Sequence, residues 1–140
     1  MSQTILVCDD DKEIAAAVDI YLTAEGYRVL QAYDGLQALE LLRDNEDVQL
    51  ILMDVMMPRM DGVHATMKIR ESRNIPIIML SAKSEDNDKI LGLNIGADDY
   101  ITKPFNPMEL IARVKSQLRR YTRLGSVPEA TGASVVVNGG

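Results

Sequence analysis

The chain has 140 residues, enough for one domain with a substantial core and too few for two domains of ordinary size. Hydrophobic residues make up 46% and charged residues 26% of the sequence, and no apolar run approaches the roughly 20 residues needed to cross a bilayer. A formal net charge of −6 opposes direct binding to a nucleic-acid backbone, because such binding draws its affinity from lysine and arginine.

Short apolar runs alternate with segments of helical period along the chain. In chain order, they predict strands over residues 4–8, 27–32, 50–53, 77–80 and 100–102, and helices over residues 12–24, 36–44, 63–72, 86–95 and 107–121. Gly26 and Gly96 stand where helices should end, and Asn106, Pro107 and Glu109 form the pattern of a capped helix N-terminus.

The predicted strands are continuously apolar, which favours a parallel sheet covered on both faces by crossover helices. The sequence therefore predicts an α/β fold of the (βα)5, flavodoxin-like type, with five parallel strands in the order 2-1-3-4-5. Ligands of such open sheets bind beyond the carboxyl ends of the strands, so the residues that follow the strands are the functional candidates.

Polar residues follow four of the predicted strands: Asp9, Asp10 and Asp11 after the first, Asp54 after the third, Ser81 after the fourth and Lys103 after the fifth. Two carboxylates about 4 Å apart repel each other by about 4 kcal/mol at an effective dielectric constant near 20, so Asp9, Asp10 and Asp54 need a compensating cation. Mg²⁺ (or Mn²⁺) suits such an all-oxygen site.

Asp54 is then the candidate nucleophile, because carboxylates form aspartyl-phosphate intermediates. Lys103 and the Ser81 hydroxyl are suited to contact phosphoryl oxygens. Phosphoryl transfer requires mainly in-line positioning and neutralisation of charge, and this set of residues provides both.

Each candidate also has a purely structural interpretation. Asp9, Asp10 and Asp11 could simply begin a helix, where acids favour the helix dipole, and Asp54, Ser81 and Lys103 could be ordinary turn, loop and surface residues. Their shared position at strand ends favours function. Four methionines are expected to fill gaps in the core, namely Met53, Met56, Met57 and Met60. Cys8 is expected to be buried and His64 to be a surface residue without a catalytic part.

The motifs Asp9-Asp10, LILMDVMMPRMDG, Ser81-Ala82 and GADDYITKPF match in order and spacing the receiver domains of bacterial two-component response regulators, which the sequence resembles over residues 3 to about 121. The resemblance implies a signalling phosphoacceptor, not an enzyme, with a sensor histidine kinase as its partner. Asp54 would accept the phosphoryl group, and Lys103 and Ser81 would contact it.

The same resemblance assigns a metal site and a switch. Asp10 and Asp54 would bind Mg²⁺ directly, Asp9 would bind it through water, and Met56 would contribute its carbonyl oxygen. Tyr100 would be an aromatic switch residue that acts with Ser81. A cis peptide bond between Lys103 and Pro104 is implied as well.

The ADDYITKPF stretch and the basic last helix most resemble the OmpR-type subfamily, whose receivers pair through the fourth helix, fifth strand and fifth helix. This resemblance implies a homodimer on phosphorylation. The implied ion pairs between subunits are Lys89 with Glu109, Asp99 with Arg113, and Asp98 with Arg120. As exposed pairs, each would contribute about 1 kcal/mol or less.

Residues 122–140 have a different character from the rest of the chain. They are small and polar until Ser134–Val137, which leads into Asn138-Gly139 as a strand leads into a hairpin turn. We expect a receiver domain over residues 1–121, followed over residues 122–140 by a linker and the start of a truncated output domain. In the OmpR-type subfamily that domain is a winged helix, so DNA would be bound only through the missing domain.

Three other functions fit the sequence less well. A flavodoxin-like electron carrier needs a Ser/Thr/Gly-rich phosphate loop where Asp9, Asp10 and Asp11 stand. A phosphatase with an aspartyl nucleophile usually has a second acid where Met56 stands. A degenerate receiver that acts as a scaffold usually lacks the acceptor or the lysine, and both are present here. Because the N-terminus has no secretory signal, we expect a cytoplasmic location without membrane association.

Overall fold

The computed structural model describes residues 3–82 and 96–121. Within these ranges the chain forms β1 (Thr4–Cys8), α1 (Lys12–Ala24), β2 (Arg28–Ala32), α2 (Gly35–Asp44), β3 (Val48–Asp54), α3 (Gly62–Arg70), β4 (Ile77–Ala82), β5 (Asp99–Lys103) and α5 (Pro107–Arg120). The helix predicted over residues 86–95 lies outside the described residues, as do Lys89 and residues 122–140. No helix in the described ranges is long and apolar enough to span a bilayer.

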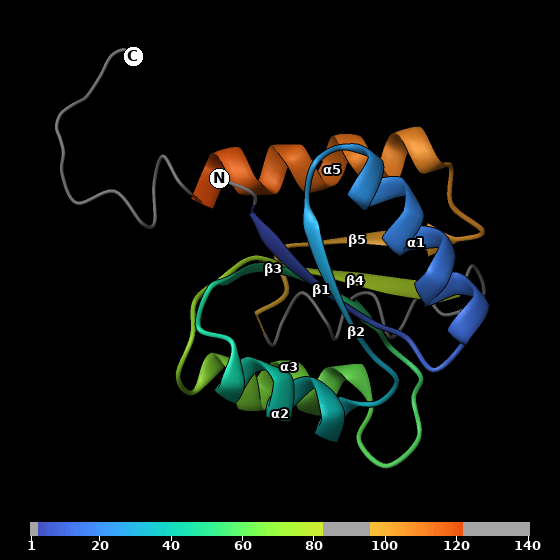
Figure 1. The fold of residues 1–140 in the computed structure, drawn as a ribbon. Coiled ribbons are helices and arrows are strands. Elements are labelled where there is room, and N and C mark those ends of the chain that lie inside the picture. The colour runs from blue at the N-terminus through green and yellow to red at the C-terminus, as the bar shows by residue number, and fades with distance from the viewer. Residues whose placement is uncertain (1–2, 83–95, 122–140) are drawn as a thin grey trace, which may run out of the picture.

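The five strands form one parallel sheet in the order β2-β1-β3-β4-β5, which confirms the predicted (βα)5 fold. Helices α1 and α5 cover one face of the sheet, and α2 and α3 cover the other (Figure 1). Three strands are longer than predicted: β3 reaches Asp54, β4 reaches Ala82, and β5 runs from Asp99 to Lys103. Asp54 and Ser81 are therefore held by strand backbone and not by a loop.

Successive side chains of a strand point to opposite faces of the sheet, so each strand contributes side chains to the core on both faces. Ile5, Val7, Leu50 and Leu52 are fully buried on the side of α1 and α5. The residues between them face α2 and α3, including Leu6, Cys8, Ile51 and Met53. Both faces of the central strands are apolar for this reason, as the continuous runs in the sequence predict.

The helices begin at side chains that accept hydrogen bonds from free backbone N–H groups. Asp11, Asp34, Asp61 and Asn106 cap α1, α2, α3 and α5, respectively. Caps of this kind typically contribute about 1 kcal/mol each. The predicted cap at Asn106 is confirmed, with its side chain accepting from the N–H groups of residues 108 and 109.

Cys8, His64 and the methionines differ in their burial. Cys8 is fully buried, as predicted, and the His64 side chain is 71% exposed, also as predicted. Met53 is buried in the core. The prediction for Met56 is wrong, because this residue is 60% exposed. The chain leaves the sheet after Asp54 with Val55 turned inward, so the next side chain points outward.

Candidate functional site

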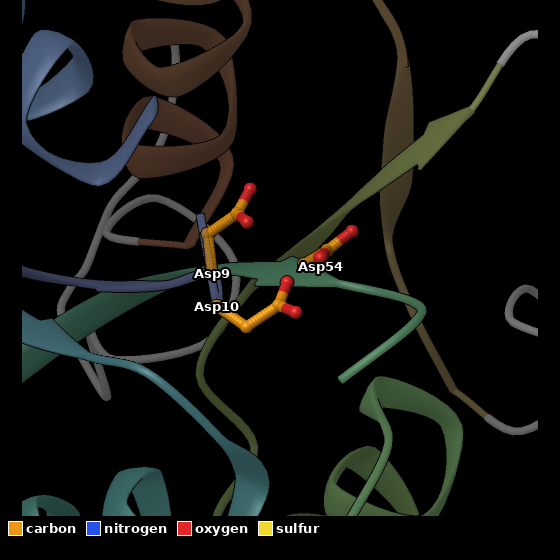
Figure 2. Close-up of side chains that lie close together, drawn as sticks. All are labelled: Asp9, Asp10 and Asp54. Carbon is orange, nitrogen blue, oxygen red and sulfur yellow. The ribbon is translucent and has the colours of Figure 1, made fainter. Parts of the chain in front are cut away.

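The carboxyl ends of β1, β3 and β5 bring the predicted site residues together. Strands β1 and β3 are neighbours, and their register places Cys8 opposite Met53, so the residues that follow, Asp9 and Asp54, stand at the same level. Lys103 is the last residue of β5. Figure 2 shows the carboxylates of Asp9, Asp10 and Asp54 gathered at this edge of the sheet.

Asp9, Asp10 and Asp54 form an acidic cluster. Each contributes a carboxylate oxygen, and these three oxygens lie within 4.8 Å of one another. Asp9 and Asp54 are buried, whereas Asp10 is exposed to solvent. The cluster therefore has one open side, formed by Asp10, and two carboxylates that are largely withdrawn from water.

The three consecutive aspartates are divided between a helix cap and the acidic cluster. Asp11 is the cap of α1 and accepts hydrogen bonds from the N–H groups of Glu13, at 3.0 Å, and Ile14, at 3.3 Å. Asp9 accepts from the N–H of Asp11 at 2.9 Å, which fixes its other oxygen toward the cluster. The helix-terminus interpretation therefore holds for Asp11, and the cluster interpretation for Asp9 and Asp10.

Lys103 supplies a positive charge to the acidic cluster. Its Nζ atom lies 2.7 Å from Oδ2 of Asp9 and 3.2 Å from Oδ1 of Asp54. Burial works against the charged lysine, but its hydrogen bond to Asp9 and the charges of both carboxylates outweigh this effect, so the pKa of Lys103 is raised above its ordinary value. The lysine stays charged and bridges the two buried acids.

Asp54 has a strongly perturbed pKa. Burial and the neighbouring charge of Asp9 raise the pKa of Asp54 from 3.8 to about 7, although Lys103 acts in the opposite direction. One lysine does not fully compensate two buried carboxylates and the adjacent Asp10. This arrangement favours an additional cation, and three carboxylate oxygens are the hard ligands that Mg²⁺ prefers.

The predicted switch residues lie on the neighbouring strands. Ser81 is buried on β4, and its hydroxyl donates to the carbonyl of Ala82 at 3.1 Å, so its hydrogen bond in this structure is to backbone. Tyr100 on β5 is half-buried and packs against the core on the α2 and α3 side of the sheet. The peptide bond between Lys103 and Pro104 is cis, as the resemblance implies.

The predicted dimer-face charges form contacts within the single chain. Arg113 on α5 binds both carboxylate oxygens of Asp99 on β5, at 2.7 and 2.9 Å, and also contacts Glu109. The first contact joins α5 to β5, and the second lies within α5. Within the chain, Asp98 is bound by Arg70 at 2.8 Å and by the N–H of residue 77, and Arg120 is exposed; the pairs between subunits stay predictions.

Two residues close to the site were not predicted from the sequence. Asp34 caps α2 and binds the guanidinium group of Arg59, which lies in the loop after β3. The dipeptide Asp34-Gly35 before a helical segment is a capping signal that could have been noticed. The partner could not, because 25 positions separate the two residues and no spacing rule connects them.

Comparisons with known proteins agree with this geometry. A sequence profile of the response regulator receiver domain matches residues 5–115. Regulatory protein VanR of Enterococcus faecium is 49% identical over 140 residues, which are 100% of this chain and 60% of that protein. VanRc of Enterococcus gallinarum is 51% identical over 123 residues, 88% of this chain and 53% of that protein.

Solved structures give the same result. The receiver domain of the Francisella response regulator 1452 is 40% identical and superimposes with a TM-score of 0.79, covering 85% of this chain and 98% of that one. The chain spans 60% of the length of VanR and 53% of the length of VanRc.

Proposed function

This chain belongs to the response regulator receiver domain family, and from this membership we propose that Asp54 accepts a phosphoryl group from the phosphohistidine of a sensor histidine kinase. The observation that carries the proposal is the position of Lys103 Nζ between two buried carboxylates, 2.7 Å from Asp9 and 3.2 Å from Asp54. A fixed positive charge at this point can bind a phosphoryl oxygen as it arrives beside Asp54.

The proposed step exchanges one bond to phosphorus for another. A carboxylate oxygen of Asp54 forms the new O–P bond while the P–N bond of the phosphohistidine breaks, and the bonding electrons return to the imidazole. Lys103 neutralises charge on the transferred group throughout, and the Ser81 hydroxyl turns from the Ala82 carbonyl to donate to a phosphoryl oxygen. The product is an aspartyl phosphate, so the chain acts as a signalling phosphoacceptor.

The acidic cluster is the proposed cation site. Asp10 and Asp54 would bind Mg²⁺ (or Mn²⁺) directly, with Asp9 acting through water and Met56 through its carbonyl oxygen. The bound cation would offset the carboxylate charges and attract a phosphoryl oxygen. Support comes from the three carboxylate oxygens within 4.8 Å and from the pKa of Asp54, which burial and Asp9 raise to about 7.

We further propose that the chain is an OmpR-type receiver that controls an output domain. Movement of Ser81 toward the phosphoryl group would change the packing of Tyr100 and thereby the surface formed by β5 and α5. That surface would form a homodimer, with Lys89, Asp98, Asp99, Glu109, Arg113 and Arg120 at its interface. Residues 122–140 would lead to a DNA-binding domain, and the whole protein would act in the cytoplasm without binding a membrane.

The phosphoacceptor assignment is tested by measuring intact mass after treatment with acetyl phosphate and Mg²⁺. We expect one added phosphoryl group in the wild type and none in Asp54→Asn or in the presence of EDTA. Asp44→Asn removes an exposed carboxylate on α2 and should be labelled like the wild type. Labelling of Asp54→Asn would contradict the proposal.

A further inference from the structure

The loop that carries Met56 is held by the N-terminus of α2. This segment, residues 55–61, joins β3 to α3 and is called the acceptor loop below. Arg59 within it has a φ of 64°, in the left-handed region that non-glycine residues rarely occupy. Such a backbone conformation persists only when surrounding contacts stabilise it, so Arg59 must be held in place by its neighbours.

Asp34 provides the main contact. Its Oδ2 atom accepts two hydrogen bonds from Arg59, 2.9 Å from Nε and 2.7 Å from Nη2. Its Oδ1 atom accepts the capping hydrogen bond from the N–H of Gln37 at 2.8 Å. The Asp34 side chain is only 12% exposed, whereas the Arg59 side chain is 60% exposed, so the shielding from water concerns the carboxylate.

Two further contacts hold the same loop against the same helix end. The N–H of Gly35 donates to the carbonyl of Met60 at 3.0 Å. A Cβ atom at Gly35 would lie 2.5 Å from that carbonyl oxygen, so only glycine allows this approach. The Cys8 thiol contacts both the carbonyl of Asp34, at 3.3 Å, and the sulfur of Met57, at 3.4 Å.

These contacts are made by residues close to Met56 in the loop, and the Met56 side chain takes no part in them. Residues 59 and 60 are bound to the N-terminus of α2 and residue 57 contacts Cys8 at the end of β1, whereas the Met56 side chain is 60% exposed. At the other end of the loop, the N–H of Gly62 donates to the carbonyl of Val55 at 2.9 Å. The backbone position of Met56 is thus set by its neighbours in the loop.

We infer that Asp34 and Arg59 are positioning residues for the cation site, because their ion pair fixes the acceptor loop and with it the Met56 carbonyl. This inference rests on the proposed function, in which that carbonyl is a cation ligand. Neither residue belongs to the acidic cluster. Their effect on cation affinity is therefore indirect, through the place and rigidity of one ligand.

The two carboxylate oxygens of Asp34 accept hydrogen bonds from different partners, so the bond to Arg59 can be tested separately from the helix cap. Asparagine caps helices as well as aspartate does, so Asp34→Asn can keep the bond from Gln37 while it removes the charge that pairs with Arg59. Arg59→Ala removes the same pair from the other side. Because both substitutions break one interaction, the double variant should behave like either single variant.

The measurement is Mn²⁺ binding to the full chain at fixed pH, followed by the electron paramagnetic resonance signal of free Mn²⁺. We expect Asp34→Asn and Arg59→Ala each to weaken binding about tenfold, the lower end of the range for residues that orient metal ligands. Hydrogen exchange of the acceptor-loop amides should become faster in both variants without Mn²⁺.

Arg73→Ala is the matched control. Arg73 also connects separate segments through its guanidinium group, donating to the carbonyls of Leu42 at 3.0 Å and Glu46 at 2.8 Å, but it does so at the opposite end of α2. Arg73→Ala should lower the melting temperature without changing Mn²⁺ affinity.

Wild-type affinity in Asp34→Asn and Arg59→Ala would overturn the inference while leaving the cation site intact. Failure of the wild type to bind Mn²⁺ would overturn the cation site and this inference together.

Discussion

The Nζ atom of Lys103 lies 3.2 Å from Oδ1 of Asp54, although the two residues are 49 positions apart in the sequence. The lysine also binds Asp9, so its single charge is divided between two buried acids. Each acid is therefore only partly neutralised. An incoming phosphoryl group, which brings further negative charge, would compete with Asp9 for the same ammonium group.

We predict that removal of the Asp54 charge stabilises the metal-free protein in a pH-dependent manner. Burial and Asp9 raise the folded-state pKa of Asp54 to about 7, above its ordinary value of 3.8. A group with a raised pKa gives its full contribution to stability below its unfolded pKa and loses it as the pH rises through its folded pKa. The stability gained by Asp54→Asn should therefore grow from about pH 4 to about pH 7 and then level off.

Thermal unfolding in EDTA between pH 4 and pH 8 provides the measurement. Asp44→Asn removes the same formal charge from a side chain that is 67% exposed, and its effect on the melting temperature should be small at every pH. Adding Mg²⁺ at pH 8 should reduce the difference in melting temperature between wild type and Asp54→Asn. The wild type should bind the cation more tightly and therefore be stabilised more. A pH-independent difference would show that Asp54 ionises normally.

The fold was predictable because its signals are local. Continuous apolar runs such as residues 5–7 require burial on both faces, and Asn106 with Pro107 marks a helix start without reference to the rest of the chain. The acidic cluster was also predictable, because parallel strands end at one edge of the sheet. These inferences need only the pattern of one segment and a general rule of topology.

Other features depend on contacts that no local pattern contains. The aspartates at 9, 10 and 11 are chemically identical, and only the backbone path separates the cap at Asp11 from the cluster at Asp9 and Asp10. The pairing of Asp34 with Arg59 and the pairing of Asp98 with Arg70 each join segments more than 20 positions apart. Such pairs are selected by packing among many available charges.

We predict that phosphorylation promotes a symmetric dimer in which Arg113 is required. Arg113 binds Asp99 and Glu109 within the chain, so Arg113→Glu would place a third carboxylate beside these two. Repulsion within and between subunits should weaken association. Sedimentation with a phosphoryl mimic should give dimers for the wild type and mainly monomers for Arg113→Glu.

Arg43→Glu is the control for the change of charge. Arg43 lies near the end of α2, on the opposite face of the sheet from α5, and its side chain is 72% exposed. This variant should dimerise like the wild type. An Arg113→Glu protein that is folded and dimerises fully would mean that another surface is used.

The aspartyl phosphate should have a long lifetime. Hydrolysis needs a water molecule in line with the P–O bond, and a neighbouring acid or amide would orient or deprotonate that water. The side chains two positions after Asp54 and two after Ser81 are those of Met56 and Lys83. Met56 is apolar and 60% exposed, and Lys83, outside the described residues, is cationic, so neither is a suitable base. We therefore predict slow loss of the phosphoryl group, and faster loss in Met56→Asn or Lys83→Glu. Decay of a radiolabel measures the rate; decay of the wild type within seconds, or unchanged rates in both variants, would contradict this explanation.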